Sequence, residues 1–170
     1  MGYKNKTLKS NKQGFTLIEL LVVIAIIALL SSVALIAFMS ARQKSRDAKR
    51  VGDMTQMATG MELYFNTQKG YPSAPSGIPT ALKPNYASTL PASPLPADGG
   101  CDLIDYHSIN ASIPASTFAS QYYYFPSGTV YIGFDGVSQV YPDYVYYFCL
   151  GNLTGNLSAG VHQVTPRGLR

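Results

Sequence analysis

Groups that carry out catalysis are scarce in this chain of 170 residues. It has only two histidines, His107 and His162, and neither stands in a known catalytic pattern. No Gly-x-Ser-x-Gly nucleophile elbow and no glycine-rich phosphate-binding loop occur. We therefore expect neither an enzyme nor a bound cofactor.

Proline is missing from a long N-terminal stretch, and charge is nearly missing from its first half. No proline lies between Phe15 and Tyr71, so nothing forces a helix to break there. From Phe15 to Met39 the only ionisable side chain is Glu19. A run of this length can cross a hydrocarbon core of about 30 Å as a helix. We predict one helix over residues 15–69, which spans a membrane over about 17–39.

Glu19 stands out within this apolar run. A carboxylate at intramembrane depth costs roughly 2.5–3.5 kcal/mol on insertion scales, which favours a functional role. The alternative is that Glu19 lies near the end of the helix and reaches the lipid headgroups. Its position alone does not decide between the two.

The residues around Glu19 join a basic leader to the apolar run. They read Lys12-Gln13-Gly14-Phe15-Thr16-Leu17-Ile18-Glu19, with uninterrupted aliphatic residues to Ile27. This segment resembles the processing site of type IV prepilins and type II secretion pseudopilins. The resemblance implies that a prepilin peptidase cuts after Gly14 on the cytoplasmic face and methylates the new amine of Phe15. It also makes Glu19 the glutamate that the family uses in assembly.

Cleavage at this site would place a cationic amine one helical turn before the anionic Glu19. Each buried charge is then less costly if it meets the opposite charge of a neighbouring subunit. One departure from the family pattern is Ile36, which stands where many type IV pilins have a helix-kinking proline.

An ordinary secretory signal peptide is the competing interpretation. Its apolar region should have about 7–15 residues and end at a small-residue cleavage site. Met39-Ser40-Ala41 resembles such a site. The apolar run is longer than this, however, and Glu19 does not suit a signal peptide.

Basic residues flank the apolar run on both sides, over residues 1–14 and 42–50, so counting them assigns no orientation. Cys101 and Cys149 are more informative. An even count outside close metal-ligand spacing indicates one disulfide in an oxidising compartment, with two buried free thiols as the alternative. A disulfide places the C-terminal part outside the cytoplasm and the leader inside it, in a single pass of the inner membrane.

The helical pattern changes after Met39. An apolar stripe continues at spacings of three and four, through Val51, Met54, Ala58, Met61 and Phe65. We expect the stripe to pack on later residues of the chain, and a coiled-coil partner is the alternative. Gly70-Tyr71-Pro72 then ends the helix.

Residues 70–170 are expected to form a globular head. Residues 71–120 are rich in Pro, Ala and Ser, which indicates a long ordered loop. Strand patterns follow over about 121–150, in the segments Gln121–Phe125, Thr129–Phe134, Val137–Tyr141 and Tyr144–Leu150. Asp135-Gly136 is a strong two-residue hairpin signal. We predict an α+β fold, a long helix packed on a small antiparallel β-meander, which the pilin resemblance also implies.

The head offers weak ligand candidates. Asp98, Asp102 and Asp105 could supply oxygens to Ca²⁺, which some related pseudopilins bind in this region. They lack EF-hand spacing, so solvated loop acids are the expected role and no metal is predicted.

Tyrosines are concentrated in the head, where nine of the thirteen lie between Tyr106 and Tyr147. Strand propensity and a small core explain them. Stacking on nucleic acid would need a basic groove. The basic residues of the head are only Lys83, Arg167 and Arg170, so nucleic acid is not an expected partner.

These features predict a structural subunit that polymerises through its apolar helix into a type IV pilus-like filament. A pseudopilin of a type II secretion system is the alternative, and a secreted binding domain is a third class. The expected partners are copies of the chain, related pilins, the prepilin peptidase, an inner-membrane assembly machinery and, before assembly, the lipid bilayer. The final location is an extracellular pilus or a periplasmic pseudopilus.

Overall fold

A computed structural model describes residues 14–101, 103–113 and 121–170. The chain divides into two compact units, Met1–Ser40 and Ala41–Arg170. Helix α1 runs without interruption from Leu17 to Gln68 and contributes residues to both units. The predicted long N-terminal helix is therefore confirmed, and it continues unbroken through Ile36.

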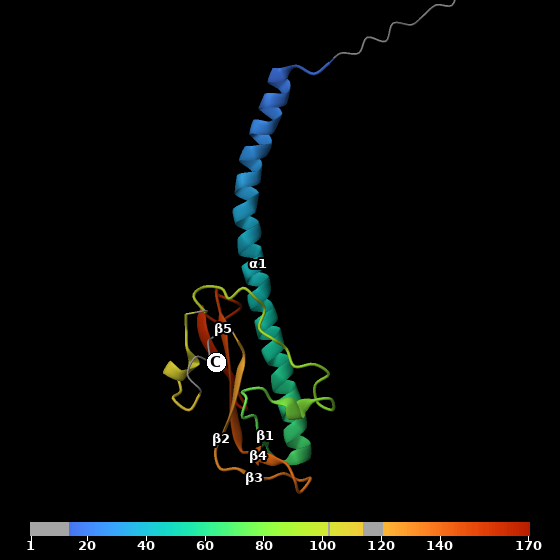
Figure 1. The fold of residues 1–170 in the computed structure, drawn as a ribbon, viewed down its shortest axis with the longest axis vertical. Coiled ribbons are helices and arrows are strands. Elements are labelled where there is room, and N and C mark those ends of the chain that lie inside the picture. Colours follow the sequence, from blue (N-terminus) through green and yellow to red (C-terminus); the bar gives the residue numbers. More distant parts are fainter. Residues whose placement is uncertain (1–13, 102, 114–120) are drawn as a thin grey trace, which may run out of the picture. The chain divides into compact units, whose positions relative to one another are not determined.

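Seven strands occur among the described residues of the second unit (Figure 1). They are β1 (Tyr71–Pro72), β2 (Tyr123–Ser127), β3 (Tyr131–Ile132), β4 (Gln139–Tyr141), β5 (Asp143–Leu150), β6 (Gly160–Thr165) and β7 (Gly168–Leu169), with short 3-10 helices η1 (Thr80–Leu82) and η2 (Tyr106–Ser108). One antiparallel sheet has the order β1-β4-β3, and the other has the order β2-β5-β6-β7.

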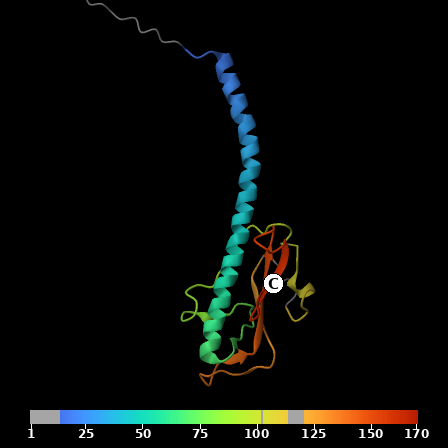
Figure 2. The same ribbon diagram turned by 180° about the vertical axis from the view of Figure 1, so that it is seen from behind.

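The main core lies between the second half of α1 and the four-stranded sheet. Figures 1 and 2 show β2 and β5 running beside this part of the helix. The predicted apolar stripe faces the sheet: Met54 and Met61 are buried, and Val51, Ala58 and Phe65 pack around them. From β5 the core receives Tyr144, Tyr146, Phe148 and Leu150. The stripe thus packs on the chain's own head, as predicted.

Strand β5 is buried on both faces because its side chains alternate between two clusters. Tyr147 and Cys149 point away from the helix into a second cluster, which contains Cys101 and Tyr106. The chain after Asp98 therefore covers the face of the sheet that α1 leaves open.

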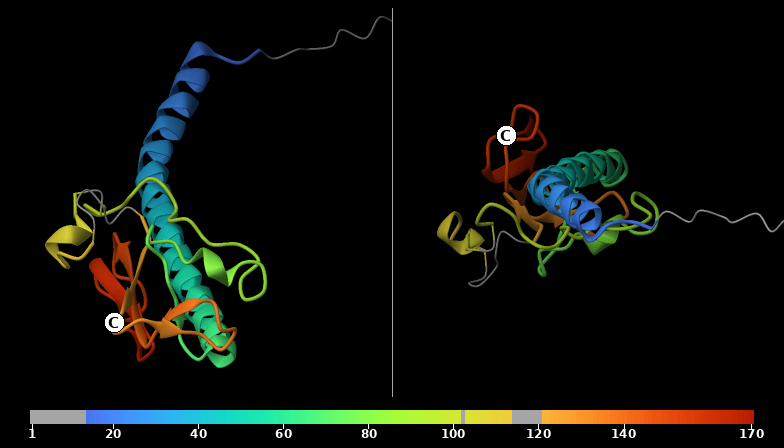
Figure 3. Two further views of the ribbon diagram at one scale, coloured as in Figure 1. Left: turned by 60° about the horizontal axis from the view of Figure 1, so that its bottom comes forward. Right: turned by 90° about the horizontal axis from the view of Figure 1, so that it is seen from above.

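The loop region after β1 packs on a different side of α1, as Figures 2 and 3 show. Gly60 makes this close approach possible, since a Cβ at that position would lie 3.2 Å from the carbonyl oxygen of Tyr86. The sheet and the loop region together bury the helix around Met57 and Met61.

The sheets differ from the predicted meander in two respects. First, β6 and β7 lie beyond residue 150, where we predicted no strand. Second, the turn between β3 and β4 is longer than two residues, because the carboxylate of Asp135 accepts hydrogen bonds from the amides of Val137 and Ser138 and orders a wider loop. β2 also includes Pro126, which a strand tolerates at the edge of a sheet.

Candidate functional site

The predicted processing and assembly residues lie at the start of α1. Gly14 and Phe15 precede the helix, and the Phe15 side chain is 92% exposed. Gly14 does not have a left-handed backbone, and nothing lies within 4 Å of a Cβ built on it. The fold of this chain would therefore accept a side chain at position 14, so any need for glycine there must come from a protein that acts on the chain.

Glu19 closes the first turn of the helix together with Thr16. The Glu19 carboxylate accepts hydrogen bonds from the backbone amide of Thr16 at 2.8 Å and from its hydroxyl at 2.7 Å. In return, the Thr16 hydroxyl accepts a hydrogen bond from the Glu19 amide at 3.2 Å. This reciprocal arrangement is a capping box. It holds the carboxylate back toward Phe15, the residue whose amine cleavage would expose.

The helix surface after Glu19 is apolar on all sides. Among residues 14–40 the large aliphatic and aromatic side chains are at least about half exposed, from Leu17 to Met39. The helix is long and apolar enough to cross a membrane, by length and composition. The Ser32 hydroxyl donates to the Leu29 carbonyl at 2.7 Å, so its hydrogen bond is made within the helix. Such a surface can meet lipid or the equivalent surfaces of other copies.

A cluster of four charged residues, three of them buried and Arg46 partly exposed, lies near the start of the second unit. Arg50, which is 1% exposed, donates to Asp47 at 2.6 Å and to Asp98 at 3.2 Å. Arg46 also binds Asp98, with both carboxylate oxygens engaged. We call Arg46, Asp47, Arg50 and Asp98 the ion cluster. Two positive and two negative side chains compensate one another within it, as buried charges require.

The ion cluster joins three segments of the chain. Besides Asp47 on α1, Arg50 binds the loop region, where it donates to Asp98 and to the carbonyl oxygens of Pro94 and Pro96. Asp47 accepts hydrogen bonds from the backbone amides of Gly151 and Asn152, just after β5. Hydrogen bonds from Arg46 lower the pKa of Asp98 by more than its burial raises it, so the carboxylate is ionised.

The predicted disulfide between Cys101 and Cys149 is present, with Cα atoms 5.9 Å apart. It lies next to the ion cluster, since the Cys101 amide donates to the carbonyl of Asp98 at 3.1 Å. Gly151 permits the close approach there, because a Cβ on it would lie 2.3 Å from the Cβ of Asp98. The ion cluster holds Asp98 and the disulfide holds Cys101, so the short loop of residues 98–101 is fixed at both of its ends.

The two calcium candidates among the described residues, Asp98 and Asp105, each have other partners. Asp98 is already neutralised by Arg46 and Arg50. Asp105 caps η2 by accepting from the amide of His107, and Asp102 lies outside the described residues. Within the described ranges, no group of three His, Cys, Asp or Glu side chains could hold a metal ion.

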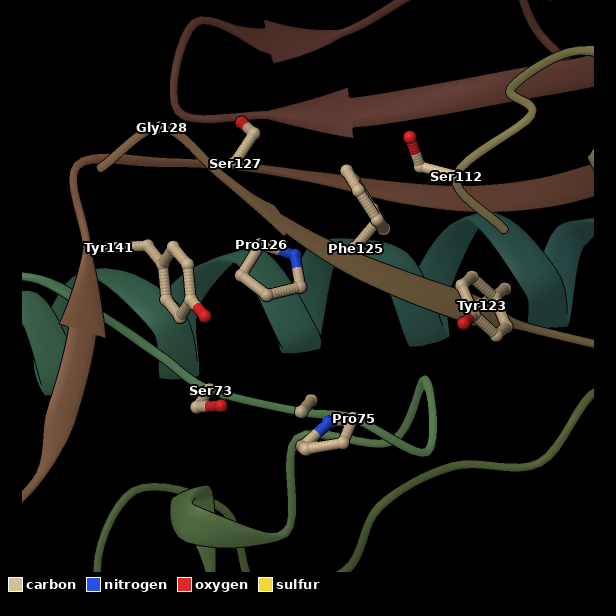
Figure 4. A pocket seen from close by; sticks show the side chains of 10 residues that line it. Ser73, Pro75, Ser112, Tyr123, Phe125, Pro126, Ser127, Gly128 and Tyr141 are labelled. Atoms are coloured by element: carbon tan, nitrogen blue, oxygen red, sulfur yellow. The ribbon is translucent and has the colours of Figure 1, made fainter. Parts of the chain in front are cut away.

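An open pocket of about 500 Å³ lies between β2 and the chain that follows β1 (Figure 4). Tyr123, Phe125 and Pro126 of β2 line it together with Ser73 and Pro75. The residues recorded as lining it include no carboxylate, histidine, lysine or arginine, so they offer no group for proton transfer near neutral pH. Pro126 has no N–H to offer, which protects this edge of the sheet from further strand pairing.

Comparison with known proteins agrees with the N-terminal geometry. The prokaryotic N-terminal methylation motif matches residues 9–35, which include the Gly14–Phe15 junction and Glu19. The N-terminal segment of the chain is therefore similar to that of prepilin-type proteins.

Particular relatives extend the similarity past this motif. The type II secretion system core protein G of Aeromonas hydrophila is 29% identical over 85 residues, which are 50% of this chain and 59% of that protein. The core protein G of Escherichia coli K12 is 32% identical over 80 residues, or 47% and 53% of the two chains. The type IV wide pilus major component PilA4 of Thermus thermophilus is 38% identical over 63 residues, or 37% and 48%.

The chain spans about half the length of the curated relatives that it matches. No solved structure matches it. The predicted resemblance to type IV prepilins and type II secretion pseudopilins is confirmed by the motif and by these relatives.

Proposed function

We propose that this chain is a structural subunit of a type IV pilus-like filament. It is made as a membrane precursor, cut after Gly14, methylated at Phe15 and polymerised through the apolar first half of α1. The observation that carries the proposal is the Thr16–Glu19 capping box, which directs the one acid of the apolar run toward the cleavage junction.

The apolar surface alone does not explain why such a chain would leave a bilayer. In lipid that surface is already out of water. The hydrophobic effect therefore does not favour moving it from the bilayer into a bundle of helices. Charge pairing does distinguish the two environments. The amine of a cleaved Phe15 and the carboxylate of Glu19 can neutralise each other between neighbouring helices, and this favours the bundle.

The alternative filament is the pseudopilus of a type II secretion system. The matches to core protein G favour it, and the match to a pilus component favours the pilus. Both filaments need the same helix, the same processing and the same inner-membrane machinery. In both, the leader lies in the cytoplasm and the disulfide-bonded head lies outside it.

Gold-labelled antibody against the head, applied to whole cells that express the chain, tests the proposal. Labelled surface fibres are expected for a pilus. Fibres that appear only when the chain is overproduced, with a periplasmic pool otherwise, are expected for a pseudopilus. A chain that never enters a fibre in either condition, although its N-terminus is processed, would contradict both.

A further inference from the structure

The last residue of β3 and the turn that follows it present apolar side chains to solvent. Ile132, Phe134 and Val137 are 58%, 82% and 81% exposed, and we call them the hairpin patch. The acid among them, Asp135, accepts hydrogen bonds from the amides of Val137 and Ser138. Its charge is therefore engaged within the turn, and the apolar side chains form the tip.

The hairpin patch is held firmly in place. The Phe134 amide donates to the carbonyl of Gln68 at 3.1 Å, and the Gln68 side chain accepts from the Asp135 amide at 3.1 Å. The turn is thus fastened to the last residue of α1. Exposed apolar side chains on an ordered turn indicate a contact surface, because a soluble surface gains nothing from them.

A second apolar surface lies elsewhere on the same unit. It is a pocket of about 410 Å³, which we call the side pocket, and its walls include Ile78, Leu90, Pro91, Leu95, Tyr122 and Tyr146. None of the residues recorded as lining it is charged. Leu95, at 75% exposed, stands at its rim.

The two surfaces lie at different levels along α1. The Tyr122 hydroxyl of the side pocket donates to Asp53 at 2.8 Å, and Ser93 of the pocket lies 3.5 Å from the Arg50 guanidinium. The hairpin patch is instead bonded to Gln68. The levels of residues 51 and 68 are separated by about 25 Å at 1.5 Å per helical residue.

Copies in a filament of the proposed kind must touch through unlike surfaces. All copies come from the same membrane orientation, so their helices point in one direction, and two copies displaced along that direction cannot be related by a two-fold axis. A contact repeated between such copies is heterologous, and it extends into an open helical assembly when a protruding apolar group of one copy enters an apolar pocket of the next.

We propose that the hairpin patch of one copy enters the side pocket of a second copy displaced by about 25 Å along the direction of α1. The inference rests on the proposed filament function, and it adds the head-to-head contact that the apolar helix does not supply. The partner is a second copy because the chain itself carries both halves of the contact and the filament repeats them at high local concentration.

Charge substitutions at the two surfaces test the contact in cells that express the full chain. Val137→Lys and Leu95→Glu should each lower the amount of sheared filament by about tenfold. This is the loss expected when a charge replaces one apolar side chain of an interface. The double variant should recover most of it, because the new lysine and glutamate then face each other across the contact.

Two matched controls place the same charges on exposed leucines outside both surfaces. Leu153→Lys and Leu103→Glu change side chains that are 70% and 81% exposed, and should leave the filament yield unchanged. Equal losses in the controls, or no recovery in the double variant, would overturn the contact.

The outcomes separate this inference from the function on which it rests. Normal filaments from both single variants would overturn the head contact alone. Absence of filaments from the wild-type chain would overturn the proposed function, and the head contact with it.

Discussion

Arg46 holds Asp98 through two hydrogen bonds, 2.8 Å from Nε to one carboxylate oxygen and 2.6 Å from a terminal nitrogen to the other. The two residues are 52 positions apart in sequence. Their ion pair attaches the loop before Cys101 to the first turns of α1 within the second unit. Arg50 reinforces it from the next turn of the helix.

Replacing Asp98 by Asn should destabilise the head by about 3 kcal/mol. This is the lower end of the range for a broken buried pair, because Asp47 continues to face Arg50. The measurement is denaturant unfolding of the full chain in detergent, followed by near-ultraviolet circular dichroism of the tyrosines. The control is Asp105→Asn, which should cost less than about 1 kcal/mol because the asparagine keeps an oxygen that can cap the short helix η2. Equal losses from both variants would show that the ion cluster contributes no special stability.

The buried tyrosines make the head sensitive to alkali. Burial raises the pKa of Tyr106, Tyr124 and Tyr146 above the ordinary phenol value. A folded pKa above the unfolded one stabilises the native state fully below about pH 10, and this stability is lost as the pH rises further. Tyrosinate absorbance should therefore rise in a steep step that coincides with unfolding. A smooth, reversible titration of all tyrosines with the fold intact would contradict this packing.

Gly14→Leu should block processing without harming the fold. A side chain at position 14 meets nothing within the chain, so the uncut protein should still insert into the membrane and form its Cys101–Cys149 disulfide. The proposed peptidase, in contrast, is expected to need a close approach of the backbone at the bond that it cuts, and a side chain at position 14 would crowd that approach. Immunoblots should show only the longer precursor. Cleavage after residue 14 at the normal rate would refute the assigned site.

Glu19→Ala should leave expression, membrane insertion and cleavage nearly intact but strongly reduce filaments. Without the carboxylate, the amine of Phe15 would be buried among apolar helices with no opposite charge, at about 3–5 kcal/mol. That is roughly a hundredfold or more for each subunit added. Glu19→Gln should behave similarly, because an amide keeps the shape and loses the charge. Filaments of normal number and length from either variant, with no wild-type copy present, would exclude the pairing.

The parts of the fold that depend on local pattern could be predicted from the sequence. The helix follows from a proline-free stretch, and its sheet-facing side follows from the spacing of Met54, Ala58 and Met61. The motif around Glu19 is contiguous, so it was readable as well. Even there, the pattern did not reveal that Thr16 forms the other half of a capping box, although Thr-x-x-Glu is its known signature.

Features that depend on distant partners were missed. Arg50 and Asp53 lie off the apolar stripe, yet both are buried. Their partners, Asp98 and Tyr122, are 48 and 69 residues away, and no local signal links them. β6 was missed because glycines and asparagines crowd the chain before it, and its strand character depends on pairing with β5.

The most direct test of the whole account is the mass of the N-terminal peptide of the chain taken from sheared filaments or from the membrane. The account predicts a peptide that begins with N-methylated Phe15 and contains no residue of the leader. A mature chain that begins at Arg42, released in soluble form, would contradict it and support ordinary secretion instead.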